Sequence, residues 1–412
     1  MRLRIKDFAV KVGSGITPKG GAEIYQKAGI PLFRSQNVTD DGFLMDDIAY
    51  ISPDIDNSMS GSRVLANDVL LNITGASIGR CYFTAKDFIR GNVNQHVCII
   101  RPRQNIVTTK FLYYCLISAS GKEQIKLSQN GANREGLTIE SIKNFSFNIP
   151  SLERQMAISD YLDIKLKNIK EQIYFLSKKK EKFQQLKVSL IYNTVFHGLN
   201  PSATMKDTGI DWIGMIPQSW EMKRVKDICS YVSRGCTPSY VDISKYYVMN
   251  QATFSKGYID ISNVRYTANY NNDALLRPGD LIMASTGGGV LGKVLYYDDK
   301  LAKFIADSHV TIFRDKRNEM KYYYYLFSIQ YKMINDCLSK GSTNQTELQR
   351  DKVLSLMLPY PPYEEQVSIA NYLDEKCSKI DTIMEKISQE ITLLDKLKKS
   401  LINEVITGKR TV

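Results

Sequence analysis

The sequence contains few residue patterns of the kind that catalysis requires. The segment Tyr360-Pro-Pro-Tyr363 has the form of the Pro-Pro motif with which amino-methyltransferases hold their target amine, but that motif begins with Asn or Asp. A carboxamide or carboxylate in the first position accepts a hydrogen bond from the amine, and a tyrosine does not serve in that way. Because proline ends regular structure, we interpret the segment as a stop before a helix.

A glycine-rich segment has the spacing of a nucleotide-binding loop. Gly287-Gly-Gly-Val-Leu-Gly292 matches G-x-G-x-x-G, which binds dinucleotides where a helix follows within a βαβ unit. Here the following residues, Lys293-Val-Leu-Tyr-Tyr297, have the composition of a strand. We therefore expect a tight turn, whose backbone could come close to a DNA phosphate.

The other residue types that do chemistry are scattered. Pro53-Asp54 lacks the Glu-x-Lys half of a nuclease core, and the histidines His96, His197 and His309 lie far apart. The seven cysteines are odd in number and form no C-x-x-C pair, which favours reduced thiols over disulfides or a zinc site. We expect no cofactor, no metal site and no catalytic activity.

The sequence repeats itself once. Val12-Gly-Ser-Gly-Ile-Thr-Pro18 matches Val232-Ser-Arg-Gly-Cys-Thr-Pro238 at an offset of 220, and Lys110-Phe-Leu-Tyr-Tyr114 matches Lys321-Tyr-Tyr-Tyr-Tyr325 at an offset of 211. The first part of each half drifts in sequence and length, whereas the second part keeps its length. This contrast indicates two variable modules carried by two constant spacers.

The constant parts are predicted to be long helices that form a coiled coil. Apolar residues alternate four and three apart in the same register in both copies, which is the heptad pattern of a helical seam. The predicted seam residues are Leu162, Leu166, Ile169, Ile173, Leu176, Phe183 and Leu190 in the first copy, and Leu373, Ile380, Met384, Ile387, Ile391, Leu394 and Leu401 in the second. We expect the two seams to pack on each other as an antiparallel pair, since each would otherwise leave an apolar stripe in water.

The variable parts have the pattern of mixed α/β domains. Short β-rich runs such as Asp68–Ile73 and His96–Ile100 recur, separated by Gly, Asn, Asp and Pro clusters. A helix is predicted at about 108–127 and again at about 319–338. The predicted organisation is a first recognition domain at 1–148, a first helix at 149–198, a linker at 199–220, a second recognition domain at 221–358 and a second helix at 359–412.

The linker carries a resemblance to a known family. Met205-Lys-Asp-Thr-Gly-Ile-Asp-Trp-Ile-Gly-Met-Ile-Pro-Gln-Ser-Trp-Glu221 resembles the segment before a target-recognition domain in the specificity subunits of type I restriction–modification systems. Trp212, Gly214, Pro217 and Trp220 carry much of the match. The order of domain, helix, domain and helix is similar over essentially the whole chain. Many relatives also have the Trp-Ile-Gly element before the first domain, and this chain lacks it there.

The resemblance implies a function and partners. Each α/β domain would read one half of a bipartite, asymmetric site in double-stranded DNA, and the helical pair would set the spacing. Methyltransferase subunits, two per chain in the family, would then methylate adenine at that site, and separate motor-nuclease subunits would join for restriction. The net charge of +12 agrees with a polyanionic partner.

Candidate DNA contacts are the Arg, Lys, Asn, Gln and His residues in the predicted loops, because such side chains bind base edges and phosphates. In the first domain they are Lys19, Arg34, Gln36, Asn37, Arg80, Asn94, Gln95, Asn133 and Arg134. In the second they are Arg234, Asn250, Gln251, Lys293, His309, Asn344 and Gln345. Matched places hold different residues, so the two half-sites are expected to differ.

Two other functions fit parts of the same pattern. The chain could be the recognition arm of another type of restriction–modification enzyme, or a coiled-coil scaffold that binds no DNA. The tyrosines Tyr322–Tyr325 could stack on bases, but the match to Tyr113 and Tyr114 favours packing. No apolar run approaches the length of a membrane span and no signal core follows Met1, so we expect a cytoplasmic protein with no membrane partner.

Overall fold

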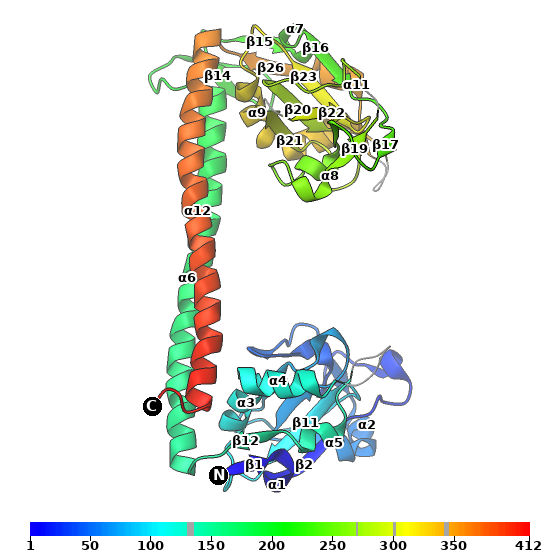
Figure 1. The fold of residues 1–412 in the computed structure, drawn as a ribbon, viewed down its shortest axis with the longest axis vertical. Helices are drawn as coiled ribbons and strands as arrows, with labels where there is room; N and C mark the ends of the chain where they lie inside the picture. Colours follow the sequence, from blue (N-terminus) through cyan, green and yellow to red (C-terminus); the bar gives the residue numbers. More distant parts are fainter. Residues whose placement is uncertain (130–135, 269–270, 300–301, 342–345) are drawn as a thin grey trace. The chain divides into compact units, whose positions relative to one another are not determined.

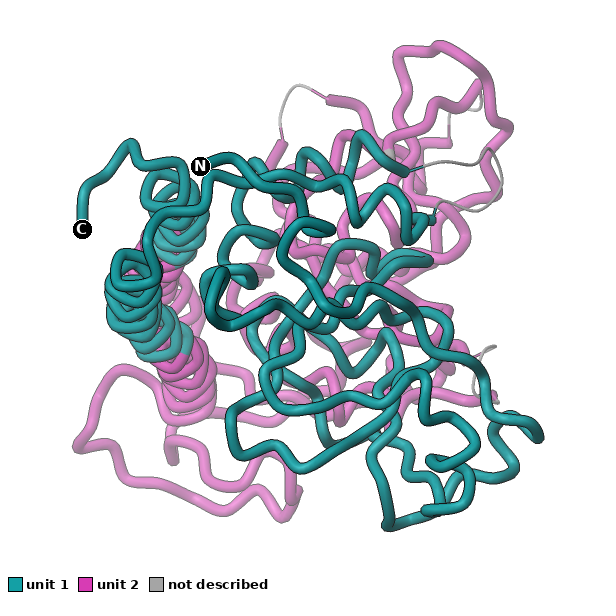
Figure 2. The backbone as a smooth tube through the Cα atoms, turned by 90° about the horizontal axis from the view of Figure 1, so that it is seen from below, with its two compact units in different colours: residues 1–177, 388–412 teal, residues 178–387 magenta. Residues whose placement is uncertain are grey.

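The chain forms two compact units. The computed structural model describes residues 1–129, 136–268, 271–299, 302–341 and 346–412. Unit 1 contains residues 1–177 and 388–412, and unit 2 contains residues 178–387; Figure 2 colours them separately. Each unit has an α/β body and a segment of each of two long helices (Figure 1). The predicted mixed α/β class with an internal repeat is confirmed.

The body of unit 1 contains two four-stranded sheets. The first is antiparallel and has the spatial order β2 (Ala9–Ser14), β11 (Val97–Pro102), β8 (Val69–Asn72) and β9 (Cys81–Phe83). The second has the order β6 (Ala49–Ile51), β3 (Ile30–Phe33), β10 (Gly91–Val93) and β7 (Arg63–Val64), with β10 parallel to β3. The central strand β8 is buried along its whole length, as expected of a strand that is covered on both faces.

The body of unit 2 repeats this topology. Its antiparallel sheet has the order β16 (Tyr231–Arg234), β23 (Val310–Arg314), β20 (Asp280–Ala284) and β21 (Val294–Tyr297). Its second sheet has the order β17 (Tyr240–Val241), β19 (Arg265–Thr267), β18 (Tyr246–Met249) and β22 (Lys303–Ala306), with β18 parallel to β22. The sequence repeat is therefore a structural repeat, strand for strand in the first sheet.

A two-stranded pairing closes each body next to its long helix. The antiparallel pairs are β1 (Arg2–Arg4) with β12 (Ser146–Asn148), and β15 (Glu221–Arg224) with β26 (Met357–Tyr360). The linker forms a hairpin of β13 (Met205–Asp207) and β14 (Met215–Pro217). After it, Trp220 is fully buried and its indole N–H donates to Glu365 at 2.9 Å. The linker that carries the family resemblance thus packs against the second long helix.

The two long helices are α6 (Leu152–His197) and α12 (Tyr363–Ile406). In unit 1, Leu162 and Leu166 share a core with Leu401. In unit 2, Ile191 shares a core with Leu373. The start of each helix therefore packs with the end of the other, which is the predicted antiparallel arrangement. Every residue of the predicted seam is buried or half-buried.

The prediction of one continuous helix at about 108–127 is wrong, because the structure has two helices there. The structure has α3 (Thr109–Ile117) and α4 (Ala119–Leu127), with Ser118 between them in an extended conformation. The Ser118 hydroxyl accepts a hydrogen bond from Gly121 N–H and so begins the second helix. In unit 2, α9 (Met320–Ser328) also stops early, and a short α10 (Tyr331–Met333) follows it. Apolar periodicity continues across such a break and does not reveal it.

The glycine-rich segment 287–292 is a turn, as the sequence predicts. It connects β20 and β21, which are antiparallel neighbours, so no βαβ unit is present there. Gly287, Gly289 and Gly292 have φ values of 90°, 84° and 86°, which L side chains rarely adopt. The dinucleotide-binding interpretation is therefore excluded by topology.

The cysteines give a first test of the fold. Cys81, Cys98 and Cys115 are buried in unit 1, and burial raises the pKa of Cys98 to about 12. Cys337 is exposed. Because the thiolate is the reactive form, we expect iodoacetamide to label Cys337 in the native protein and the three buried cysteines only after unfolding. Peptide mass spectrometry of the native and the urea-unfolded chain measures this, and native labelling of Cys81 would contradict the fold.

Across the described residues, no helix combines the length and the apolar character needed to cross a membrane.

Candidate nucleic-acid interface

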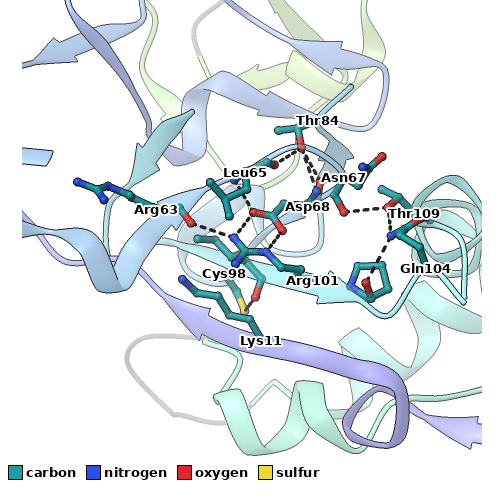
Figure 3. A network of polar contacts seen from close by, with 12 residues as sticks. Lys11, Arg63, Leu65, Asn67, Asp68, Thr84, Cys98, Arg101, Gln104 and Thr109 are labelled. Carbon is teal, nitrogen blue, oxygen red and sulfur yellow. Dashed lines mark hydrogen bonds and ion pairs between the residues drawn. The ribbon is translucent and has the colours of Figure 1, made fainter. Parts of the chain in front are cut away.

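A buried ion pair holds the central strands of each antiparallel sheet together. In unit 1 the Arg101 guanidinium donates to both oxygens of Asp68, at 2.7 and 2.8 Å (Figure 3). Asp68 is fully buried and also accepts a hydrogen bond from Leu65 N–H. In unit 2, Arg314 donates to both oxygens of Asp280 at 2.6 Å. The same pair therefore fixes β8 against β11 and β20 against β23, and so places the loops at the strand ends.

A second repeated contact attaches each body to its long helix. The Gln155 amide of α6 is fully buried, accepts a hydrogen bond from Thr108 N–H and donates to the carbonyl of Ile106. At the matched place, Gln366 of α12 accepts a hydrogen bond from Glu319 N–H and donates to the carbonyl of Pro361. Each glutamine thus binds the backbone at the N-terminus of α3 (Thr109–Ile117) or α9 (Met320–Ser328) from the start of a long helix.

The tyrosines at the start of α3 and α9 are packing residues. The hydroxyls of Tyr114 and Tyr325 donate to Asp163 and Asp374 at 2.5 and 2.6 Å. These two tyrosines are 3% and 6% exposed, and Tyr322 is fully buried. The packing role that the sequence favours is confirmed, and these rings are not available to stack on bases.

Four loop segments meet at one edge of the body of unit 1, and we call them loop cluster 1. They are residues 15–19, 34–37, 73–80 and 94–96. Asn94 N–H donates to the carbonyl of Phe33 at 3.3 Å, and Ile73 N–H donates to the carbonyl of His96 at 3.0 Å. The Asn72 amide donates to the carbonyl of Ser35 at 2.7 Å.

The same four segments meet in unit 2, as loop cluster 2. They are residues 235–239, 250–253, 285–293 and 307–309. Asp307 N–H donates to the carbonyl of Met249 at 3.0 Å, and Ser285 N–H donates to the carbonyl of His309 at 2.8 Å. The backbone of the two clusters is therefore equivalent, although their side chains differ.

A glycine in the first segment makes this convergence possible. A Cβ on Gly15 would lie 1.8 Å from the carbonyl oxygen of Val93, and a Cβ on Gly235 would lie 2.0 Å from that of Ala306. No side chain fits at such distances. The glycine of the repeated Gly-x-Thr-Pro motif is thus explained by the close approach of the first segment to β10 and β22.

Loop cluster 1 brings together seven of the residues proposed from sequence as DNA contacts. Lys19, Gln36, Arg80 and Gln95 are exposed, whereas Arg34 and Asn94 are half-buried. Asn37 is 1% exposed, and its amide donates to the carbonyls of Leu44 and Asp47. We therefore leave Asn37 out of the proposed DNA contacts, because its polar atoms are used inside the chain.

Arg34 is partly held by the protein. Its guanidinium donates to the carbonyl of Asp47 at 2.6 Å and pairs with the Asp47 carboxylate at 3.4 Å. Its buried Nε has no hydrogen-bond partner among the described residues. Asn94 is also used locally, since its side-chain oxygen accepts a hydrogen bond from His96 N–H at 3.1 Å.

Loop cluster 2 contains four of the predicted residues, and a fifth, Arg234, ends β16 immediately before it. Arg234 and His309 are exposed, and Asn250, Gln251 and Lys293 are half-buried. Arg234 pairs with Glu347 at 3.3 Å, and the oxygen of Asn250 caps α8 (Gln251–Phe254) by accepting a hydrogen bond from Thr253 N–H. The Gln251 amide donates to the Thr286 hydroxyl at 2.7 Å.

The remaining predicted contacts, Asn133, Arg134, Asn344 and Gln345, lie outside the described residues.

Sequence reasoning missed the threonines of both clusters and one histidine. The Thr74 hydroxyl lies 2.6 Å from Nδ1 of His96, and the Thr286 hydroxyl lies 2.9 Å from Nδ1 of His309. Thr17 donates to the side-chain oxygen of Gln95. The signal was present in the repeat, since Thr74-Gly75 matches Thr286-Gly287, and the histidines stand at matched places.

In unit 1 an ion-pair cluster attaches the α/β body to both long helices. The matched place in the described part of unit 2 has a different ion pair. Asp41 lies between β4 (Val38–Thr39) and β5 (Gly42–Phe43), and its carboxylate contacts Lys170 of α6 at 2.9 Å and Lys398 of α12 at 2.6 Å. At the places matched by the offset of 211, unit 2 has Asp381 and Lys187, which pair directly at 2.6 Å. The two lysines of unit 1 thus need an acidic residue from the body.

We expect Asp41→Asn to weaken unit 1 at neutral pH. Burial acts to raise the pKa of Asp41, but hydrogen bonds from Lys398 and Lys170 outweigh it, and the pKa is lowered. A lowered pKa means that the stabilisation is complete above the unfolded-state value and is lost as the pH falls through the folded-state value. Because the group is half-exposed, the effect should be about 0.2–1 kcal/mol.

Urea unfolding at pH 7 and at pH 3 measures this effect, with Asp46→Asn as the control on an exposed neighbour. The difference between Asp41→Asn and the wild type should shrink at pH 3. An equal difference at both pH values would show that the charge is not the cause.

Among the described residues, no three or more His, Cys, Asp or Glu side chains lie together as a group that could hold a metal ion.

The comparisons with known proteins agree with this geometry. The family model "Type I restriction modification DNA specificity domain" matches residues 2–174 and again residues 217–393. The MjaVIII specificity subunit of Methanocaldococcus jannaschii is 24% identical over 360 residues, covering 83% of this chain and 79% of that protein. A second protein of that organism, provisionally named as the MjaX specificity subunit, is 27% identical over 204 residues, and the match covers 47% of each chain.

Solved structures give the same fold. A chain from a type I restriction–modification system, studied for its assembly and conformational transition, has a TM-score of 0.78 at 14% identity and covers 100% of this chain and 98% of its own. The HsdS subunit of Thermoanaerobacter tengcongensis has a TM-score of 0.57 at 14% identity, with coverage of 100% and 97%. Because the family model matches both halves of a repeated fold, this chain belongs to the family of type I restriction–modification DNA specificity subunits.

Proposed function

We propose that each unit reads one half of a bipartite, asymmetric site in double-stranded DNA, and that loop clusters 1 and 2 are the reading surfaces. The observation that carries this proposal is that one backbone frame occurs twice with different polar side chains. Arg34 and Ser35 stand where unit 2 has Asn250 and Gln251, and Gln95 stands where unit 2 has Ser308. A common frame with exchanged side chains suits two readers of different sequences.

Duplex DNA suits the clusters better than single strands do. The exposed residues are Arg, Lys, Gln and His, which bind base edges and phosphates from a groove. The described tyrosines of α3 and α9, which would suit base stacking, are committed to packing. The net charge of +12 supports a polyanionic ligand of this kind.

We further propose that the chain is not itself an enzyme and acts by placing partner subunits. Its partners would be methyltransferase subunits, two per chain, which modify adenine, and motor-nuclease subunits, which restrict unmodified DNA. The Pro-Pro segment at 360–363 supports this, because Pro361 is committed to the contact with Gln366 at the start of α12. A DNA-bound chain without partners should then leave adenine unmethylated.

The test is a genome-wide map of methylated adenine in the host, with and without this gene. We expect one bipartite, asymmetric motif to lose its methylation on deletion and to regain it on complementation. The proposal fails if the parent strain expresses the gene and every methylated motif is still methylated after the gene is deleted. A second experiment incubates the purified chain with S-adenosylmethionine and duplex DNA in the absence of partner subunits. Methyl transfer under those conditions would contradict a non-catalytic role.

A further inference from the structure

The two loop clusters share a small set of side chains within their otherwise different surfaces. Thr74 and His96 in unit 1 match Thr286 and His309 in unit 2, and the same hydroxyl-to-Nδ1 contact is present in both, at 2.6 and 2.9 Å. Arg80 and Lys293 also occupy matched places, since each carbonyl accepts a hydrogen bond from the matched strand, from Asn72 N–H and Ala284 N–H at 2.8 Å. Each cluster thus repeats a threonine, a histidine and a cation.

The hydrogen bonds of unit 2 favour one tautomer of the histidine ring. The Gln251 amide donates to the Thr286 hydroxyl, so this hydroxyl is free to donate its own hydrogen to Nδ1 of His309. A ring that accepts at Nδ1 carries its hydrogen on Nε2 when neutral. Within the described part of the chain, Nε2 of His309 has no hydrogen-bond partner, and His309 is exposed. The ring therefore offers a donor to a ligand outside the chain.

The matched cations of the two clusters are also unused. Arg80 is exposed and Lys293 is half-buried. Neither side chain has an ion-pair or hydrogen-bond partner among the residues that the structure describes. This contrasts with Arg34 in loop cluster 1 and with Arg234 at the end of β16, which pair with Asp47 and Glu347. A free cation in the same loop cluster as an imidazole N–H and a glycine turn contributes to a set of donors suited to an anion.

Two readers of different half-sites meet the same sugar–phosphate backbone at matched places, whatever the bases. Side chains that discriminate between the half-sites must differ between the units, whereas those that bind phosphate can stay the same. We propose that Thr74, His96 and Arg80 in unit 1, and Thr286, His309 and Lys293 in unit 2, form a phosphate clamp that holds each recognition domain on the DNA backbone. The threonine is a positioning residue that sets the ring, and the imidazole Nε2 and the cation contact the phosphate. This inference rests on the proposed DNA-binding function. It names the residues that position each domain on the DNA rather than those that recognise the base sequence.

The test is duplex binding by the full chain over a range of salt concentrations. The probes are a duplex that carries the motif found by methylation mapping and a scrambled duplex of the same length. We expect His309→Ala and Lys293→Gln each to weaken binding of both duplexes by the same factor, about three- to tenfold. The slope of log Kd against log salt should fall by about 0.9 for each phosphate that the variant no longer neutralises. His197→Ala, on the third histidine, should change neither quantity.

Amide replacements separate a phosphate contact from a purely structural role. Glutamine places its amide near the position of Nε2, and asparagine near that of Nδ1. His309→Gln should therefore keep most of the affinity, whereas His309→Asn should bind as weakly as His309→Ala. A duplex with a neutral methylphosphonate at the contacted phosphate should bind wild type and His309→Ala equally. The matched changes in unit 1, His96→Ala and Arg80→Gln, should behave in the same way.

Three outcomes would overturn the clamp. If His309→Ala weakened only the motif duplex, the histidine would read a base. If Lys293→Gln and His309→Ala, folded by circular dichroism, bound both duplexes like wild type with the wild-type salt slope, the clamp would make no phosphate contact. If glutamine and asparagine failed alike, Nε2 would not be the donor. Wild-type chain that binds neither duplex would instead overturn the proposed function itself.

Discussion

Asp280→Ala is expected to destabilise unit 2 by about 3–5 kcal/mol, and Asp68→Ala to destabilise unit 1 by an amount near the lower end of that range. Removing one partner of a buried ion pair leaves the other charge without compensation. The side chains of Asp280 and Asp68 are 1% and 0% exposed, so both are equally buried. The arginines differ, because Arg314 is 12% exposed and Arg101 is 25% exposed. Arg101 is therefore better able to reach water when its partner is removed.

The measurement is urea unfolding followed by two probes. Both tryptophans, Trp212 and Trp220, belong to unit 2, so tryptophan fluorescence reports that unit. Hydrogen exchange of amides in β8 and β11 reports unit 1. Asp46→Ala, on an exposed carboxylate, is the control and should stay within about 0.5 kcal/mol of wild type. Equal unfolding midpoints for Asp280→Ala and this control would show that the pair does not hold the sheet.

The elements that the sequence predicts well are those with local or repeated signals. The heptad spacing from Leu162 to Leu190 fixes a helix and its inward face, and the structure has α6 there with each seam position at least half-buried. The repeat predicts that both bodies share one topology. It also marks Asp68 and Asp280 as matched residues, although nothing in the sequence pairs them with Arg101 and Arg314. Partner choice depends on strand register, which loops of differing length conceal.

The reading surface is harder to predict, because composition does not distinguish a polar residue that is free from one that is already bonded. Arg34 and Arg80 have the same chemistry, yet Arg34 is paired with Asp47, whereas Arg80 has no ion-pair or hydrogen-bond partner among the described residues. The contact between Asp41 and Lys398 joins residues 357 positions apart. Local pattern cannot reveal a contact of that range, and it depends on where α12 lies against the body of unit 1.

The repeat itself holds information that composition lacks. A single loop rich in Asn, Gln and Arg predicts only a solvated surface. Two matched loops on the same backbone distinguish residues that both units share from residues that differ between them. The shared residues Thr74 and His96 are identified only by that comparison. The same comparison indicates which residues to change when specificity is tested, namely those that differ between the clusters.

Gln95→Ala is expected to lower discrimination at one or two base pairs of a single half-site, by about 1–3 kcal/mol. Gln95 is exposed, and its side-chain oxygen accepts a hydrogen bond from Thr17, which leaves the amide N–H group as a donor. The matched residue in unit 2 is Ser308, so the two units cannot make the same contact. The methylation map of cells that express the variant should show a motif with relaxed sequence at those positions only.

Gln172→Ala, an exposed glutamine on α6, is the matched control and should leave the motif unchanged. Loss of discrimination in both halves would mean that Gln95 supports the fold rather than reads a base. Gln95→Ser places the unit 2 residue in unit 1, but we do not expect it to transfer the unit 2 preference, because Arg34 and Ser35 still stand where unit 2 has Asn250 and Gln251. Under the proposed function several loops of one cluster read a half-site together, so a change of preference should require that all exchanged residues of the cluster be moved as a set.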